Sequence, residues 1–229
     1  MIALLHTSPV HVPVFDALRD RDHPDVELLH TVRVDLLERA VDEGPDAVAP
    51  ALVDALVDAV GRGATSVLCT CSTLGAIAEA SAVAVGVPVL RVDRPMAAVA
   101  AGRRRVAVVA ALASTVEPTV ALIHEEARAR AGQQDGLGPA QGPDVHAVVV
   151  DGAWERFLAG DRKGYLDAVA AAVDALGDAD VIVLAQASMA DAVERTRTPV
   201  PVLSSPRSGL QGAVAALRAH QRSPRGSTG

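Results

Sequence analysis

A thiol and a carboxamide stand at corresponding places in two segments of this chain that look like copies of each other. The first segment reads ATSVLCTCST (residues 64–73) and the second reads ADVIVLAQAS (residues 179–188), and each is followed by a VPVL run, at residues 87–90 and 200–203. The unmatched pair is Cys71 and Gln186. A thiol can serve as acid, base or nucleophile, whereas a carboxamide can only donate and accept hydrogen bonds. Equivalent strand ends in a duplicated chain can meet across one cleft, so the asymmetry predicts a divided chemical role.

Cys71 is the residue whose type and position best support chemistry. It follows an apolar run and comes directly before Ser72 and Thr73, where a helix is expected to begin, and a helix N-terminus favours a thiolate. Lowering a thiol pKa from about 8.5 to about 7 takes roughly 2 kcal/mol, the upper end of what a helix N-terminus supplies, so activation needs further help. The alternative is that Cys71 is a small buried hydrophobic residue, a description that fits Cys69, inside the strand, better.

Hydroxyl side chains follow four of the predicted strands. In open α/β sheets, ligands gather beyond the carboxyl ends of strands, where helix N-termini face the crevice. Each hydroxyl can alternatively cap a helix. Together these hydroxyls predict a binding site for an anionic group such as a carboxylate, formed by Thr7, Ser8, Ser72, Thr73, Ser114, Thr115 and Ser188. Ala187, which precedes Ser188, is also expected to contact the substrate.

Short apolar runs alternate with longer segments of helical periodicity, a pattern that predicts parallel sheets flanked by helices. Strands are expected at residues 2–5, 26–30, 66–69, 87–92, 106–109, 145–150, 181–184 and 200–203. Helices are expected to include residues 47–60, 116–131 and 166–176.

The repeat predicts an α/β protein of two pseudo-symmetric subdomains, each a mostly parallel sheet flanked by helices, with the site in the cleft between them. We expect the first subdomain at residues 1–101 and the second at residues 102–205. A helix over residues 206–222 is expected to return to the first subdomain, and residues 223–229 are expected to form a disordered tail.

Composition narrows the classes of partner. The 229-residue chain has a net charge of −7, interspersed charges and only 2% aromatic residues, which argues against a nucleic-acid partner. The absence of a long uncharged apolar run and of a basic leader favours a cytoplasmic protein without a membrane span. The histidines and the Cys-x-Cys pair lack the spacing of metal ligands, and neither a P-loop nor a Gly-x-Gly-x-x-Gly motif occurs, so we expect no metal and no nucleotide cofactor.

At residues 71–73 and 184–189 the chain resembles the aspartate/glutamate racemase superfamily, which includes hydantoin racemases, maleate isomerases and arylmalonate decarboxylases. The resemblance extends over nearly the whole length and includes HTSP at residues 6–9, GVPVL at 86–90, DRPM at 93–96, the Ser114-Thr115 turn and SSPRSG at 204–209. It implies a cofactor-independent isomerase or lyase that acts on a small carboxylate-bearing substrate. The sequence leaves a homo-oligomer open.

In the racemases of that superfamily, two cysteines face each other across the substrate. The resemblance places Cys71 at the first of these positions and Gln186 at the second. Glutamine is neither a general base nor a useful general acid, which argues against two-base racemisation. Protonation of an enediolate after decarboxylation, or thiol addition to an unsaturated diacid, stays open.

Two further roles follow from the resemblance. Gln186 is expected to donate hydrogen bonds to a substrate carboxylate or developing enolate, with helix capping as the alternative. Arg207 is expected to bind a carboxylate, with a surface position as the alternative. A rival hypothesis of a different class is a non-catalytic binding or regulatory protein that keeps the cleft.

Overall fold

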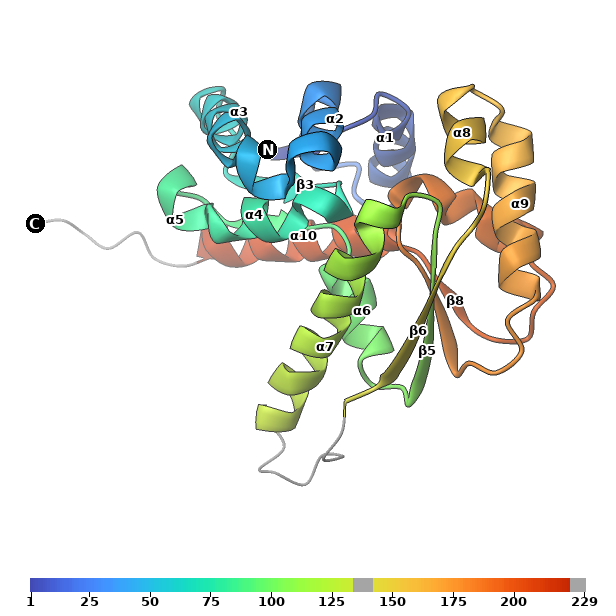
Figure 1. The fold of residues 1–229 in the computed structure, drawn as a ribbon. Coiled ribbons are helices and arrows are strands. Elements are labelled where there is room, and N and C mark those ends of the chain that lie inside the picture. The colour runs from blue at the N-terminus through green and yellow to red at the C-terminus, as the bar shows by residue number, and fades with distance from the viewer. Residues whose placement is uncertain (134–141, 223–229) are drawn as a thin grey trace, which may run out of the picture.

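The chain folds into two four-stranded parallel sheets, each with its own helices (Figure 1). The structure is a computed structural model that describes residues 1–133 and 142–222. The strand order is β2-β1-β3-β4 in the first sheet and β6-β5-β7-β8 in the second, and all neighbouring strands are parallel. The strands are β1 (Ile2–His6), β2 (Leu28–Val32), β3 (Ser66–Cys69), β4 (Val89–Arg91), β5 (Arg105–Ala110), β6 (Asp144–Val149), β7 (Val181–Leu184) and β8 (Val202–Leu203). The identical order in the two sheets confirms the predicted α/β fold of two pseudo-symmetric units.

Helices connect the strands and cover the sheets. The first half contains α1 (His11–Asp22), α2 (Val34–Glu43), η1 (Pro45–Val48), α3 (Ala49–Gly61), α4 (Ser72–Ala80), α5 (Ala82–Val85) and α6 (Arg94–Ala100). The second half contains η2 (Ala113–Thr115), α7 (Val116–Gln133), α8 (Ala153–Leu158), α9 (Arg162–Asp174), η3 (Ala187–Arg195) and α10 (Ser205–Arg222).

All eight apolar runs form strands, but several predicted bounds were wrong. The second strand begins at Leu28, because Val26 packs into the core instead of pairing with β1. The fourth and eighth strands begin only after Pro88 and Pro201, since proline has no N–H for the hydrogen-bond ladder.

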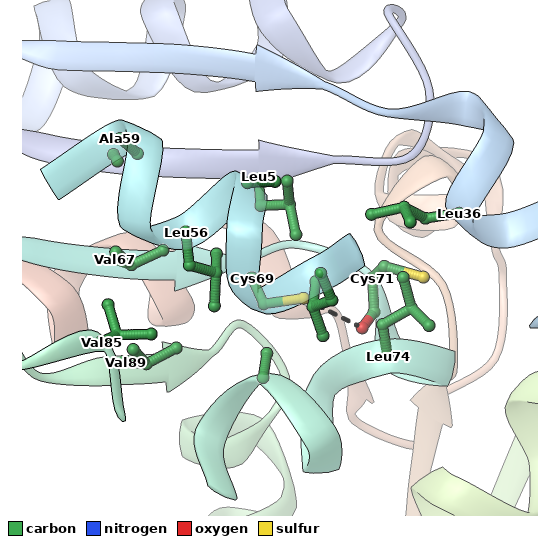
Figure 2. Packing of buried hydrophobic residues seen from close by; sticks show 14 of the residues in the cluster. Leu5, Leu36, Leu56, Ala59, Val67, Cys69, Cys71, Leu74, Val85 and Val89 are labelled. Carbon is green, nitrogen blue, oxygen red and sulfur yellow. Dashed lines mark hydrogen bonds between the residues drawn. The ribbon is translucent and has the colours of Figure 1, made fainter. Parts of the chain in front are cut away.

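The core is built mainly from aliphatic residues in four clusters. One cluster lies between the first sheet and helices α2 to α4, and it contains Leu5, Leu56, Val67 and Leu74 (Figure 2). Small and branched side chains allow the helices to approach the strands closely. The layers of this core fix the positions at which β3 and α4 meet.

Helix α10 follows the second sheet in the chain but packs on the first half of the molecule, alongside α1 and α6 (Figure 1). Its apolar residues Leu210, Val214 and Leu217 share a core cluster with Ile2 and Leu4 of β1. The tail expected at residues 223–229 lies outside the described residues.

Candidate active site

The structure places Cys71 and Gln186 at equivalent points of the two halves. Strand β3 ends two residues before Cys71, and β7 ends two residues before Gln186. Each residue has an extended backbone, with φ and ψ of −108° and 116° at Cys71 and of −124° and 140° at Gln186. Each directly precedes a helix, α4 or η3. Cys71 and Gln186 therefore occupy the same position in equivalent strand-to-helix connections, but their side chains differ in chemistry.

Both residues line one pocket between the two halves, which encloses about 400 Å³ of space free of protein atoms, including its open mouth. Nine of the residues predicted for the site line this pocket: Thr7, Ser8, Cys71, Ser72, Thr73, Thr115, Gln186, Ala187 and Ser188. Six others were not predicted: His11, Leu37, Thr70, Leu112, Trp154 and Phe157. The cleft between the halves thus brings together strand ends that are far apart in the chain.

Cys71 lies at the edge of the apolar cluster and is 7% exposed (Figure 2). Burial raises the pKa of the Cys71 thiol, although hydrogen bonding from the Thr7 hydroxyl and from the backbone N–H groups of Leu74 and Thr73 acts in the opposite direction. The N–H groups at the start of α4 thus act in the expected direction, but burial has the larger effect on the pKa of Cys71.

Cys69 is a structural residue. It is fully buried inside β3, and its thiol lies 3.6 Å from the backbone oxygen of Cys71, to which it donates a hydrogen bond (Figure 2). Burial raises its pKa, and it does not line the pocket. Its packing in the core agrees with its place within the strand.

The carboxamide of Gln186 is held in one orientation. Its oxygen accepts hydrogen bonds from the backbone N–H groups of Ala111, at 2.6 Å, and Leu112, at 3.2 Å. Because two N–H donors require an acceptor, the oxygen must face them and the NH₂ group must face away. That NH₂ group has no hydrogen-bond partner among the described residues and remains a donor for a ligand.

Several of the predicted hydroxyls hold the two halves together. The Ser72 hydroxyl donates to the backbone oxygen of Ala185 across the interface, at 2.9 Å. The hydroxyls of Thr73 and Ser114 lie 3.4 Å apart, also across it. Thr115 donates to the oxygen of Leu112 within its own turn. While these bonds persist, Ser72 and Thr115 have no hydroxyl proton to offer an anion.

Ser188 is positioned by a buried tyrosine. The hydroxyls of Tyr165 and Ser188 lie 2.8 Å apart, and Tyr165 is almost fully buried on α9. Burial raises the pKa of Tyr165 to about 12, so its hydroxyl is protonated and available for this bond. Tyr165 therefore connects Ser188 in the pocket lining to the hydrophobic core of the second half.

Aromatic residues form one side of the pocket. Trp154 and Phe157 of α8 stack with ring centroids 4.9 Å apart, and Phe157 also contacts Tyr165 at 5.3 Å. The chain has four Phe, Tyr and Trp residues in all, and three of them gather here. Trp154 and Phe157 are, with Leu37 and Leu112, the large apolar residues of the pocket lining.

Two residues predicted for the site lie outside the pocket lining. Arg207, at the start of α10, forms an exposed ion pair with Asp22, with Nε 2.9 Å from Oδ2. Ser114 reaches the interface only through Thr73. The structure therefore does not bring Arg207 to the pocket.

The described lining of the pocket contains no lysine, arginine, aspartate or glutamate. Within residues 1–133 and 142–222, no group of three or more His, Cys, Asp or Glu side chains is arranged to hold a metal ion. No helix in the same ranges combines the length and the apolar character needed to cross a membrane. An anion in this pocket would meet dipoles and N–H groups rather than cationic side chains.

A buried ion pair contacts helix α4, which follows Cys71. Arg91 binds Asp93 with Nε 2.7 Å from Oδ1, and both side chains are almost fully buried. A Cβ at Gly75 of α4 would lie 2.9 Å from Nε of Arg91, so a larger residue there would require the paired Arg91 side chain to shift. The contact sets the distance between α4 and β4.

A sequence model of the Asp/Glu/Hydantoin racemase family matches residues 11–213. The chain belongs to this family. A comparison with curated protein sequences finds no significant match. The family assignment agrees with the two parallel sheets and with the resemblance noted in the sequence.

Solved structures support the fold of this racemase-family protein. Glutamate racemase from Francisella tularensis in complex with D-glutamate aligns with a TM-score of 0.71 at 10% identity, over 96% of this chain and 81% of that one. Glutamate racemase from Thermus thermophilus in complex with β-chloro-D-alanine gives a TM-score of 0.64 at 20% identity, with the same coverage. A liganded arylmalonate decarboxylase mutant, in which cysteine replaces a glycine and serine replaces a cysteine, gives 0.60 at 26% identity, over 94% and 91%.

Proposed function

We propose that this protein is an enzyme of the racemase superfamily that acts on a small carboxylate-bearing substrate and uses Cys71 as its proton donor. The observation that carries the proposal is that the Cys71 thiol and the oriented Gln186 amide line one pocket. A racemase needs a proton-transferring group on each face of the substrate carbon. With Gln186 at the second strand end, a single-thiol reaction of the lyase or isomerase type is favoured.

The raised pKa of Cys71 distinguishes between the single-thiol reactions. Thiolate, not thiol, is the nucleophile, so a thiol whose pKa is raised by burial suits proton donation better than addition to a double bond. In a decarboxylation, loss of CO₂ from a substituted malonate leaves the bonding electron pair on the α-carbon as an enediolate. The S–H proton then moves to that carbon, and the Cys71 thiolate takes a proton from solvent.

The proposed substrate has a polar and an apolar end. The Gln186 NH₂ group and the first N–H groups of η3 would hold the carboxylate. The wall of Trp154 and Phe157 would receive an apolar substituent on the reacting carbon. The expectation of no metal or nucleotide cofactor rests on the sequence motifs alone, and a cytoplasmic location and a homo-oligomeric state stay predictions.

Turnover of 2-substituted malonates in D₂O tests the proposal. We expect release of CO₂ and incorporation of one deuterium at the α-carbon. Cys71→Ala and Cys71→Ser should lower kcat at least about a hundredfold, the usual contribution of a general acid. Cys69→Ala is the matched control, since it removes the neighbouring thiol outside the pocket, and it should keep wild-type kcat.

The alternatives give other results. Exchange of the α-proton of amino acids or hydantoins with full racemisation would contradict a single-thiol mechanism. Tight binding of these ligands and of malonates without any turnover would instead establish the rival hypothesis, a non-catalytic binding protein. Wild-type turnover in Cys71→Ala would remove the thiol from the mechanism.

A further inference from the structure

His11 is a nine-tenths buried polar side chain that no part of the described protein satisfies. It is 8% exposed and lines the pocket at the start of α1. Its ring makes no hydrogen bond to residues 1–133 or 142–222. Its nitrogens are also absent from the fully buried unpartnered atoms in those ranges, so both remain accessible to solvent. Because His11 lines the pocket and its ring has no partner among the described residues, a polar group of a ligand can take the place of water at this ring.

The neighbouring histidines are satisfied, which singles out His11. Nδ1 of His6 lies 2.8 Å from the Thr70 hydroxyl, and Nε2 of His6 lies 2.8 Å from Nδ1 of His30. The Thr70 hydroxyl donates to the oxygen of Leu5, so it accepts from His6. Nε2 of His30 in turn lies 3.2 Å from Asp16. Both ring nitrogens of His6 and His30 are thereby used within the protein.

His11 is uncharged at neutral pH. Burial lowers the pKa of His11 from 6.5 to about 4. A neutral imidazole offers one N–H donor and one acceptor nitrogen. Such a donor can stabilise a developing negative charge without the desolvation cost of a buried cation, and no lysine or arginine is among the described lining residues.

We propose that His11 donates a hydrogen bond to the substrate carboxylate and to the enediolate oxygen that forms from it. It acts from the first half of the molecule, and the NH₂ group of Gln186 acts from the second half. His11 and Gln186 hydrogen-bond the carboxylate and enediolate oxygens while Cys71 donates the proton to the α-carbon. The catalytic part of this inference rests on the proposed function, and the binding part does not.

Variants of His11 test the catalytic part. His11→Leu and His11→Phe remove the donor, and each should lower kcat about a hundredfold, the loss typical of one oxyanion donor. His11→Gln retains an N–H donor and should keep kcat within about tenfold of wild type. The matched control is His124→Leu on α7, outside the pocket, which should leave kcat unchanged. Wild-type kcat in His11→Leu or His11→Phe, or equal losses in the donor and non-donor variants, would overturn the inference.

A binding measurement separates this inference from the proposed function and does not depend on a folded variant. Phenylacetate is titrated into the wild-type protein, and the imidazole ¹⁵N resonances are followed by NMR. We expect the His11 resonances to shift with saturation while those of His6 and His30 stay in place. This result stands even if no substrate is turned over. Saturation of the protein with an unmoved His11 signal would overturn the inference even if Cys71 proves essential.

Discussion

The side-chain oxygen of Gln186 lies 2.6 Å from the backbone nitrogen of Ala111, the residue that follows strand β5. This bond joins the ends of β7 and β5, which are neighbours in the second sheet. It fixes which end of the carboxamide enters the pocket. Gln186, the counterpart of Cys71 in the second half, is therefore a donor of defined direction.

Replacing Gln186 by glutamate separates anchoring from donation. In Gln186→Glu one carboxylate oxygen can still accept from Ala111 and Leu112, but the other oxygen replaces the NH₂ donor. We expect carboxylate ligands to bind at least about tenfold more weakly at pH 7, since a hydrogen bond to a charged group is lost and repulsion is added. Calorimetric titration measures the affinity. An unchanged affinity would show that the NH₂ group does not contact the ligand.

Buried neutral histidines predict how stability depends on pH. Burial, and the nearby His11 and His30, lower the pKa of His6 from 6.5 to about 3, and the pKa of His11 falls to about 4. The unfolded chain therefore takes up protons at these rings as pH falls below 6.5, before the folded chain does. Their contribution to the free energy of unfolding is full above pH 6.5 and is lost as pH falls toward 4, by about 1.4 kcal/mol per ring and pH unit.

Urea denaturation between pH 7.5 and 4.5 measures this slope. His11→Gln should reduce it by the share of one ring, whereas His124→Gln, on α7 outside the pocket, should keep the wild-type slope. Identical slopes in wild type and His11→Gln would show that the His11 ring is charged or solvated in the folded protein.

The aromatic wall predicts a preference for substituents. Phe157→Ala removes a ring that stacks on Trp154, so an aryl-substituted acid should bind about tenfold more weakly while its methyl analogue changes little. Trp154 is the sole tryptophan, so its fluorescence reports binding directly. Leu158→Ala is the control on the same helix, because Leu158 is 68% exposed and outside the pocket lining. Equal weakening for both acids would argue against a substituent site here.

A glycine allows α10 to dock. A Cβ at Gly209 would lie 2.5 Å from the backbone oxygen of Val92, which cannot move without displacing the end of β4. Gly209→Ala should lower the free energy of unfolding by about 1–3 kcal/mol, as overpacked cores do. Gly61→Ala, at a position with nothing within 4 Å, is the control and should not destabilise. Chemical denaturation compares the two, and equal stabilities would mean that α10 can shift without loss.

Apolar runs and the repeat were sufficient to predict the sheets and the shared place of Cys71 and Gln186, because strand ends and helix starts are local features. His11, Trp154 and Phe157 gave no comparable signal. Their place in the pocket depends on how the two halves meet, which no local pattern encodes.

The remaining differences also come from long-range contacts. The Ser72 hydroxyl bonds Ala185, which is 113 residues away in the chain. The raised pKa of Cys71 comes from the depth of its burial, which outweighs the effect of the helix start that the sequence does reveal. Arg207 is paired with Asp22 of α1, a partner that only the return of α10 brings near.

Helix α10 follows both sheets in the chain, yet its Leu210 and Val214 pack against Ile2 and Leu4 of β1, which are synthesised before it. Until α10 has been synthesised, Ile2 and Leu4 of β1 lack part of the apolar cover that they have in the folded protein. The four strands of the second sheet, by contrast, all precede α10 in the chain, and they pair with one another. The core of the first half is therefore complete only once α10 has been synthesised, and a substitution in α10 would destabilise a sheet that lies far before it in the chain.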